Sequence, residues 1–285
     1  MCDSQNKPFL FMNIYNDDRE EKGEYNKFWA ACESLCSSFE KRAKGELPEM
    51  ESSKSVARLV NKLAGGRQLS LLDAGCGTGH YYVSLQRKAP QVAYTGCDVT
   101  ASYIEKAQEI WKGKPVTFRQ AEIGKLPYTD HSFDFVLCSN VLLHIPPPVF
   151  SAIKDLIRVA REVTIIRTPV ADRSYFIKEV RDYGQEMKNN ADEQMDVRYL
   201  DEQHAPFNHF NLYENRHLQG MIKKAAEELG ISVEIEFQRD VDFKPFNNTQ
   251  ETSSRTATRV MDGKQISGSI LLDWYYIIVR QRHHE

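Results

Sequence analysis

The chain has 285 residues, of which 41% are hydrophobic and 27% are charged, and its net charge is −3. It is long enough to bury a substantial core, and the absence of a basic block argues against nucleic acid or an anionic membrane as its main partner. The N-terminal sequence does not resemble a signal peptide, and no run approaches the ~18 apolar residues of a membrane span, so we expect a cytoplasmic protein.

The first 66 residues predict helices. Apolar side chains recur at helical spacing over residues 28–39 and again over residues 55–64. We expect residues 1–66 to form a helical region or lid, and residues 67–285 to form the main domain.

From residue 71 to residue 168 the chain alternates strand and helix signals. The strand-like runs lie at 70–75, 92–98, 116–122, 133–140 and 162–168. Nearly continuous apolar strands separated by amphipathic helices predict a parallel sheet that is covered on both faces. A further helix (218–229) and two further strands (231–237 and 270–282) follow.

Two segments do not fit this minimal pattern. Residues 170–217 form an aromatic and charged insertion, and residues 238–268 separate the last two strands where a short turn would suffice. Loops of this length inside a compact domain are usually functional or disordered.

A glycine-dense turn follows the first strand. Its residues Asp73, Gly75, Gly77 and Gly79 follow the pattern D-x-G-x-G-x-G, whereas neither GxGxxG register closes and no GK[ST] follows. The pattern resembles motif I of the class I S-adenosylmethionine (SAM)-dependent methyltransferases. The resemblance implies that SAM, and its product S-adenosylhomocysteine (SAH), bind at this turn, which includes Cys76. It also implies that Asp73 orients the ammonium group of SAM.

Further positions are similar to the same family, and the stretch from Leu126 to Pro148 resembles the hallmark of its type 11-like subgroup. Asp98, followed by Val99, resembles the acidic residue that binds the ribose hydroxyls. Glu122 and Ile123 resemble the residues that bind adenine, and Asn140 lies where the family places a residue beneath the cofactor. Taken alone, Asp98 fits equally well as the cap of the next helix, and Glu122 fits a solvated charge at a strand end. The resemblance implies a Rossmann-like, doubly wound α/β sheet of seven strands, mostly parallel, with an antiparallel last strand and helices on both faces.

Histidines and aromatic residues are the candidates for the site of the methyl acceptor. His144 is the first candidate for a catalytic base, and a capping or packing histidine before the proline turn is an equal alternative. His209 is a second candidate base, and the histidine spacing fits no standard metal site, so no metal is expected. The candidates for acceptor binding are Tyr25, Trp29, His144, Tyr175 and Phe210.

Methyl transfer from a sulfonium needs alignment of the acceptor and removal of a proton where the acceptor carries one. The strand-four sequence lacks the [DNS]-PP-[YFW] pattern of methyltransferases that act on base amines. We therefore expect a small-molecule acceptor that is methylated on oxygen or nitrogen. Two alternatives remain open: a protein or RNA methyltransferase that docks through residues 238–268, and a non-catalytic SAM-fold partner subunit.

Overall fold

The computed structural model describes residues 29, 33–180, 207–241, 259–261, 264–267 and 270–282. Up to residue 171 its elements are α2 (Glu33–Ala43), α3 (Glu51–Ala64), β1 (Leu69–Ala74), α4 (Tyr81–Lys88), β2 (Val92–Asp98), α5 (Ala101–Ile110), β3 (Thr117–Gln120), β4 (Phe133–Ser139), η1 (Leu142–His144), α6 (Phe150–Val159) and β5 (Ala160–Ala171). The later elements are β6 (Lys178–Val180), β7 (Phe207–His209), β8 (Tyr213–Glu214), α7 (Asn215–Leu229), β9 (Ser232–Arg239), β10 (Arg259–Met261), β11 (Lys264–Ser267) and β12 (Ile270–Arg282).

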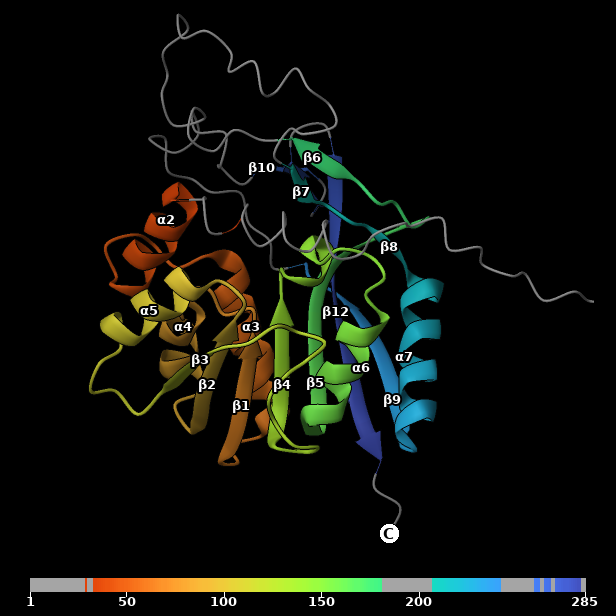
Figure 1. The fold of residues 1–285 in the computed structure, drawn as a ribbon, viewed down its shortest axis with the longest axis horizontal. Helices are drawn as coiled ribbons and strands as arrows, with labels where there is room; N and C mark the ends of the chain where they lie inside the picture. The colour runs from red at the N-terminus through yellow and green to blue at the C-terminus, as the bar shows by residue number, and fades with distance from the viewer. Residues whose placement is uncertain are drawn as a thin grey trace, which may run out of the picture.

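The seven predicted strands form the centre of one sheet, in the order β3-β2-β1-β4-β5-β12-β9 (Figure 1). Strands β3, β2, β1, β4 and β5 are parallel to one another. The last strand, β12, runs antiparallel to both β5 and β9. The structure therefore confirms the predicted doubly wound sheet with an antiparallel last strand.

The described parts of the two insertions contain strands of their own. β8 pairs with β5, and β10 and β11 extend the sheet from the N-terminal end of β12. β6 and β7 form a separate two-stranded ribbon. The sequence did not predict these strands, because each has only two to four residues and so shows little periodicity.

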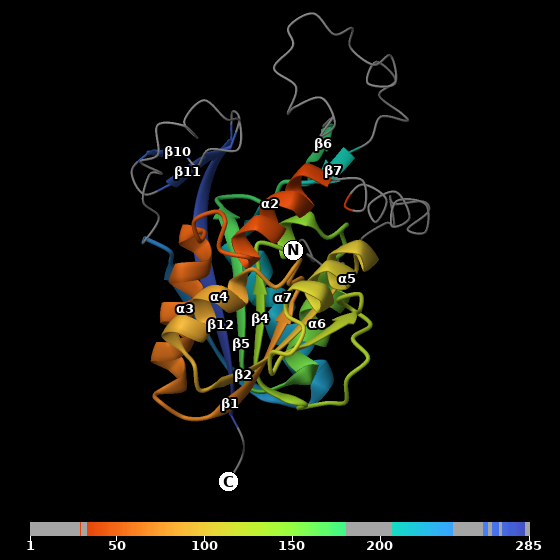
Figure 2. The same ribbon diagram turned by 90° about the vertical axis from the view of Figure 1, so that its left-hand side faces the viewer.

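Helices cover both faces of the sheet because its central strands are apolar on both sides. On β1, Leu71 packs into a cluster with α3, α4 and α5, whereas the adjacent Leu72 packs into a cluster with α6 and α7. Alternate side chains of a strand point to opposite faces, so each leucine belongs to a different core. Figure 2 shows the two layers, with α3 and α4 on one side of the sheet and α6 and α7 on the other.

The two N-terminal helices contact the main sheet domain differently. α3 buries serines as well as apolar side chains, and Ser52 accepts a hydrogen bond from the Tyr81 hydroxyl at 2.8 Å. α2 places Phe39 in a parallel stack on His80, with the ring centroids 4.4 Å apart. A division of the chain at residue 66 stays a prediction.

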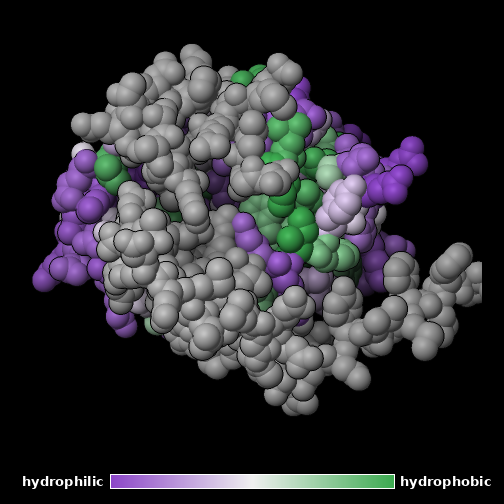
Figure 3. Space-filling view, turned by 90° about the horizontal axis from the view of Figure 1, so that it is seen from above, coloured by the Kyte–Doolittle hydropathy of each residue, from purple (hydrophilic) through white to green (hydrophobic). Residues whose placement is uncertain are grey.

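A third apolar cluster lies beyond the carboxyl ends of the parallel strands. Its buried members are Leu143, Phe210, Leu212, Leu272 and Trp274. Figure 3 views the molecule from this end and shows a band of apolar side chains with hydrophilic ones at the periphery. No helix in the part of the chain that the structure describes is both long and apolar enough to cross a membrane.

Candidate functional site

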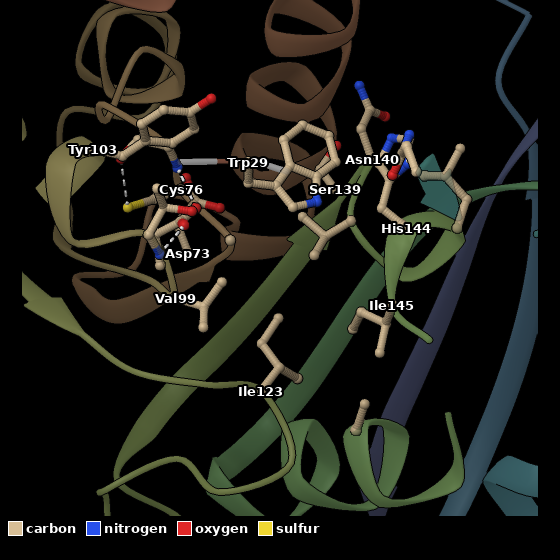
Figure 4. Close-up of a pocket in the computed structure, with 18 of the residues that line it drawn as sticks. Trp29, Asp73, Cys76, Val99, Tyr103, Ile123, Ser139, Asn140, His144 and Ile145 are labelled. Atoms are coloured by element: carbon tan, nitrogen blue, oxygen red, sulfur yellow. Dashed lines mark hydrogen bonds between the residues drawn. The ribbon is translucent and has the colours of Figure 1, made fainter. Parts of the chain in front are cut away.

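A cavity of about 410 Å³ lies at the carboxyl ends of the parallel strands. This is where ligands bind in open α/β sheets. The candidate residues that line it are Trp29, Asp73, Gly75, Cys76, Gly77, Asp98, Val99, Glu122, Ile123, Asn140, His144 and Phe210. Figure 4 shows Asp73 and Cys76 on one side of the cavity and Asn140 and His144 on the other, with Trp29 between them in this view.

Three candidates do not line this cavity. Gly79 faces the packing of Phe118 and Trp111, Tyr175 is 43% exposed, and the buried side chain of His209 is not part of the lining. Tyr25 lies outside the described residues. For Tyr175 and His209, the aromatic and charged character of the insertion was a weak guide, because it does not tell which way a side chain points.

The glycine turn is fixed by the neighbouring strand. The amide groups of Gly75 and Cys76 both donate to the carbonyl oxygen of Cys97, at 2.7 and 2.9 Å. Gly75 has φ +83°, and a Cβ atom there would lie 2.3 Å from a methyl carbon of Val141. Only glycine fits this backbone conformation and this close approach. The turn therefore brings the backbone to the wall of the cavity.

Asp73 is a buried carboxyl at the end of β1. Its Oδ2 accepts a hydrogen bond from the Tyr94 hydroxyl at 2.6 Å. Burial raises its pKa to about 7, and the nearby Asp98 acts in the same direction, while the Tyr94 hydrogen bond opposes the shift. The side chain is 3% exposed, yet it still reaches the cavity. It is thus an acceptor that a cationic ligand would stabilise in its ionised form.

Asp98 joins the turn to the following helix while it lines the cavity. Its Oδ2 accepts from the amide of Gly77 at 2.9 Å, and its Oδ1 accepts from the amide of Thr100, also at 2.9 Å. Burial raises its pKa, although these amide hydrogen bonds oppose the rise. Asp98 therefore does both things that the sequence allowed: it binds a backbone amide at the start of α5, and it lines the cavity. A carboxylate oxygen has two lone pairs, so each can accept one more hydrogen bond.

Asn140 follows β4 and has φ +60°, a left-handed conformation that asparagine tolerates better than most residues. Its side-chain amide donates to the Tyr81 hydroxyl at 3.2 Å. Ser139, just before it, also reaches the Tyr81 hydroxyl, at 3.4 Å. Both residues line the cavity, together with Tyr81.

His144 has a defined set of neighbours on the other side of the cavity. Its ring lies edge-on to Trp29 and Phe210, with centroid distances of 4.9 and 5.9 Å. Its Nδ1 lies 2.9 Å from the carbonyl oxygen of His209 and 3.0 Å from Nδ2 of Asn208. A carbonyl oxygen only accepts, so this contact requires the proton on Nδ1 and leaves Nε2 as the basic nitrogen of the neutral ring. The Asn208 side-chain amide is compatible with this tautomer if its oxygen and nitrogen are exchanged by a rotation of 180°. Oδ1 of Asn208 then faces the N–H group at Nδ1 of His144.

Sequence reasoning missed several residues of the site. Tyr81 and Ser139 flank motifs that were recognised, whereas Gln265, Leu272 and Trp274 reach the cavity from β11 and β12. The first two carried a usable signal, since they are adjacent to a glycine turn and to a strand end. The last three did not, because Gln265 lies on a short strand inside an insertion, and the pairing of that strand with β12 depends on contacts that no local pattern shows.

The lining suits SAM better than a phosphate ligand or a metal ion. The acidic Asp73, Asp98 and Glu122 come from the ends of three successive strands and meet at one cavity. SAM offers an ammonium group, two ribose hydroxyls and an adenine amine, and each of these can donate to a carboxylate. Among the described residues no group of three or more His, Cys, Asp or Glu side chains could hold a metal ion.

Comparison with known proteins places this site in context. A family model described as "Methyltransferase domain" matches residues 71–162. An uncharacterized methyltransferase of Schizosaccharomyces pombe is 31% identical over 100 residues, which are 32% of this chain and 36% of that protein. A ubiquinone/menaquinone biosynthesis C-methyltransferase (UbiE) of Bdellovibrio bacteriovorus is 34% identical over 95 residues, 32% of this chain and 39% of that protein. The 27-O-demethylrifamycin SV methyltransferase of Amycolatopsis mediterranei is 33% identical over 115 residues, 38% of this chain and 42% of that protein.

The chain therefore spans well under half the length of these curated relatives. Among solved structures, the 1,6-didemethyltoxoflavin-N1-methyltransferase of Burkholderia thailandensis, with bound 1,6-didemethyltoxoflavin and SAH, aligns with a TM-score of 0.54 at 13% identity. The alignment covers 94% of this chain and 92% of that one, and at this identity it shows a shared fold.

Proposed function

Because the chain carries a class I SAM-dependent methyltransferase domain, we propose that it transfers the methyl group of SAM to an oxygen or nitrogen of a small-molecule acceptor. The observation that carries this proposal is the meeting of Asp73, Asp98 and Glu122 with Gly75, Cys76 and Gly77 of the glycine turn at one cavity. In this assignment Asp73 serves the ammonium group, Asp98 the ribose, and Glu122 with Ile123 the adenine. Val99, Cys76 and Asn140, the last of them beneath the cofactor, complete the cofactor end.

The acceptor end of the cavity supports a compact, partly apolar acceptor. Trp29, Phe210 and Trp274 supply aromatic surface, and Leu143 and Leu272 supply aliphatic surface. Apolar and aromatic walls with a few polar groups are typical of small-molecule sites. A relative named as a 27-O-demethylrifamycin SV methyltransferase supports a small-molecule acceptor and transfer to oxygen. A relative named as a ubiquinone/menaquinone biosynthesis C-methyltransferase also supports a small-molecule acceptor, although its name gives carbon as the methylated atom.

SAM supplies an activated methyl group on a sulfonium leaving group. The chain's own residues then have two tasks, which are to align the acceptor and to remove its proton. His144 lines the acceptor end and has its basic nitrogen at Nε2, so it is the base in our proposal. The carbonyl of His209 holds the His144 ring, which gives His209 a role through its backbone.

The N-terminal segment belongs to the same proposal as a cover over the cofactor end. Leu35 and Phe39 of α2 line the cavity, and Glu40 bonds Lys106 of α5 at 2.8 Å. A location in the cytoplasm, where SAM is made and used, is also part of the proposal.

Calorimetry with SAH tests the cofactor assignment. We expect wild-type protein to bind SAH, and Asp98→Ala to weaken binding by at least tenfold, because each hydrogen bond to a charged group contributes about 1.5–3 kcal/mol. Asp130→Ala is the matched control, because this exposed carboxylate lies outside the cavity. Wild-type protein that does not bind SAH would refute the proposed function and favour a non-catalytic subunit.

Transfer of tritium from methyl-labelled SAM tests the acceptor class. Phenols and ring amines should be labelled by wild-type protein, and protein or RNA added separately should not. We expect His144→Gln to lower kcat/KM by about 10²–10⁴ for an acceptor that must lose a proton, with SAH affinity unchanged. Label in protein or RNA alone would instead support a macromolecular acceptor.

A further inference from the structure

Arg167, on β5, is fully buried and contacts residues that line the cavity. Its Nε donates to Oδ2 of Asp240 at 2.8 Å, and its Nη2 lies at the same distance from that oxygen. The other oxygen of Asp240 accepts from the Ser55 hydroxyl at 3.0 Å, and Ser55 accepts from the Tyr276 hydroxyl at 2.8 Å. The pair is thus held by β5, α3, β12 and the residue that follows β9.

A buried ion pair of this kind is weak evidence for a stabilising role. Removing two charges from water costs several kcal/mol per ion, and well-packed apolar side chains often replace such pairs without loss of stability. The guanidinium of Arg167 also makes a hydrogen bond that an apolar side chain could not make. Its Nη1 donates to Oδ1 of Asn140, which lines the cavity.

This contact fixes the orientation of the Asn140 amide. With Oδ1 held by Arg167, Nδ2 points to the Tyr81 hydroxyl, and Tyr81 in turn donates to Ser52. The backbone amide of Asn140 also donates to the carbonyl oxygen of Arg167 at 3.0 Å. Arg167 therefore holds Asn140 through both its main chain and its side chain, and the amide cannot turn over without losing a charge-assisted hydrogen bond.

The same guanidinium also packs against Trp274, which lines another side of the cavity. The Cζ atom of Arg167 lies 4.2 Å from the ring centroid of Trp274, which is the range of a cation–π contact. The backbone amide of Asp240 donates to the carbonyl oxygen of Trp274 at 2.8 Å. The ion pair thus contacts two lining residues, one at the end of β4 and one on β12.

We propose that Arg167 is a positioning residue, which holds the Asn140 amide in the orientation that binds the cofactor. The proposal rests on the proposed function, because it assigns Asn140 to the SAM end of the cavity. Asp240 anchors Arg167, and Ser55 and Tyr276 anchor Asp240, so the network extends from the N-terminal helix α3 to the last strand.

A double-mutant cycle with SAH calorimetry tests the proposal. Its variants are Arg167→Met, Asn140→Gly and the two combined. Glycine removes the Asn140 side chain and accepts φ +60° without strain. Each single change should weaken SAH binding about tenfold. The double variant should bind no more weakly than Asn140→Gly, because Arg167 acts through a side chain that is no longer there. Arg161→Met, a surface change on the same strand, should leave the affinity unchanged.

Arg167→Met leaves Asp240 buried without its partner, which can prevent folding. The variant Arg167→Met/Asp240→Asn removes both charges, and it enters the same cycle if the single variant does not fold. Losses that add in the combined variant, or a folded Arg167 variant with wild-type affinity, would overturn the proposal. Asn140→Gly with wild-type affinity would overturn it as well. Wild-type protein that does not bind SAH would instead refute the proposed function itself.

Discussion

Asp73→Asn isolates the energetic cost of the buried carboxyl beside the glycine turn. Asparagine has the same shape, and its amide oxygen can still accept the hydrogen bond from Tyr94. The substitution removes the ability to ionise and replaces one carboxyl oxygen with an amide NH2, a change that is the same at every pH. The comparison of the two proteins at several pH values therefore reports how strongly the fold resists a negative charge at this position.

The magnitude follows from the two pKa values of Asp73. The ordinary pKa is 3.8, and burial raises the folded-state value to about 7. Between these values the unfolded chain is ionised while the folded chain keeps its proton, so a rise in pH favours unfolding. A difference of about 3 pKa units at 1.36 kcal/mol each amounts to about 4 kcal/mol. This stability is present below pH 3.8 and is lost as pH rises to about 7.

Urea unfolding without cofactor, from pH 4 to pH 7.5, measures this difference. We expect similar free energies of unfolding for both proteins near pH 4, and an advantage of up to about 4 kcal/mol for Asp73→Asn near pH 7. Asp134→Asn is the control: burial raises the Asp134 pKa, but hydrogen bonds from Ser70 and from Arg161 lower it overall, below its ordinary 3.8. Its contribution is lost only at lower pH, so the difference between this variant and wild type should stay nearly constant from pH 4 to pH 7.5. A constant difference between wild type and Asp73→Asn across this range would refute the reasoning.

Three further predictions follow from single side chains. Gly75→Ala places a Cβ atom 2.3 Å from a methyl carbon of Val141, so the melting temperature of the variant should fall. Adding Val141→Ala should restore part of the loss. No recovery would show that the loss comes from the backbone strain of an alanine at φ +83° and not from the contact with Val141. Leu137→Ala, at a fully buried position in β4, should lower the free energy of unfolding in urea by about 2–5 kcal/mol. A much smaller loss would mean that the core repacks into the space left by the leucine side chain. Asp98→Ala should also loosen the glycine turn, since Gly77 loses its acceptor, and faster amide exchange at Gly77 would show it.

The sequence predicted the central fold because its signals are local. The five parallel strands are apolar runs bounded by turns, and the helices between them carry apolar stripes. The insertions were harder to predict. β6 and β7 have three residues each, and their pairing joins residues 178–180 to residues 207–209. Such pairing depends on contacts between segments that are far apart in the sequence. Strands of three residues are too short to show the periodicity by which longer strands are predicted.

The site residues also fall into those that a local sequence pattern predicted and those that depend on distant contacts. Asp73 and Asp98 were found because each closes a strand with a recognisable pattern, and Trp29 and Phe210, which were expected only as aromatics near the acceptor, do line the cavity. Arg167 was not found. An arginine inside an apolar strand usually indicates an exposed position, and its burial depends on Asp240, which is 73 residues away.

The electrostatics of the cavity decide between the two kinds of ligand that a glycine turn can serve. Free backbone amides and the start of α4 attract anions, which is why such turns often bind phosphate. Here the turn is flanked by Asp73 and Asp98, and burial raises the pKa of both. A phosphate would push these pKa values higher and would be repelled at neutral pH, whereas an ammonium or sulfonium group would lower them and favour the ionised forms. The two carboxyls thus turn a generic anion site into one that favours a cationic amino-acid cofactor.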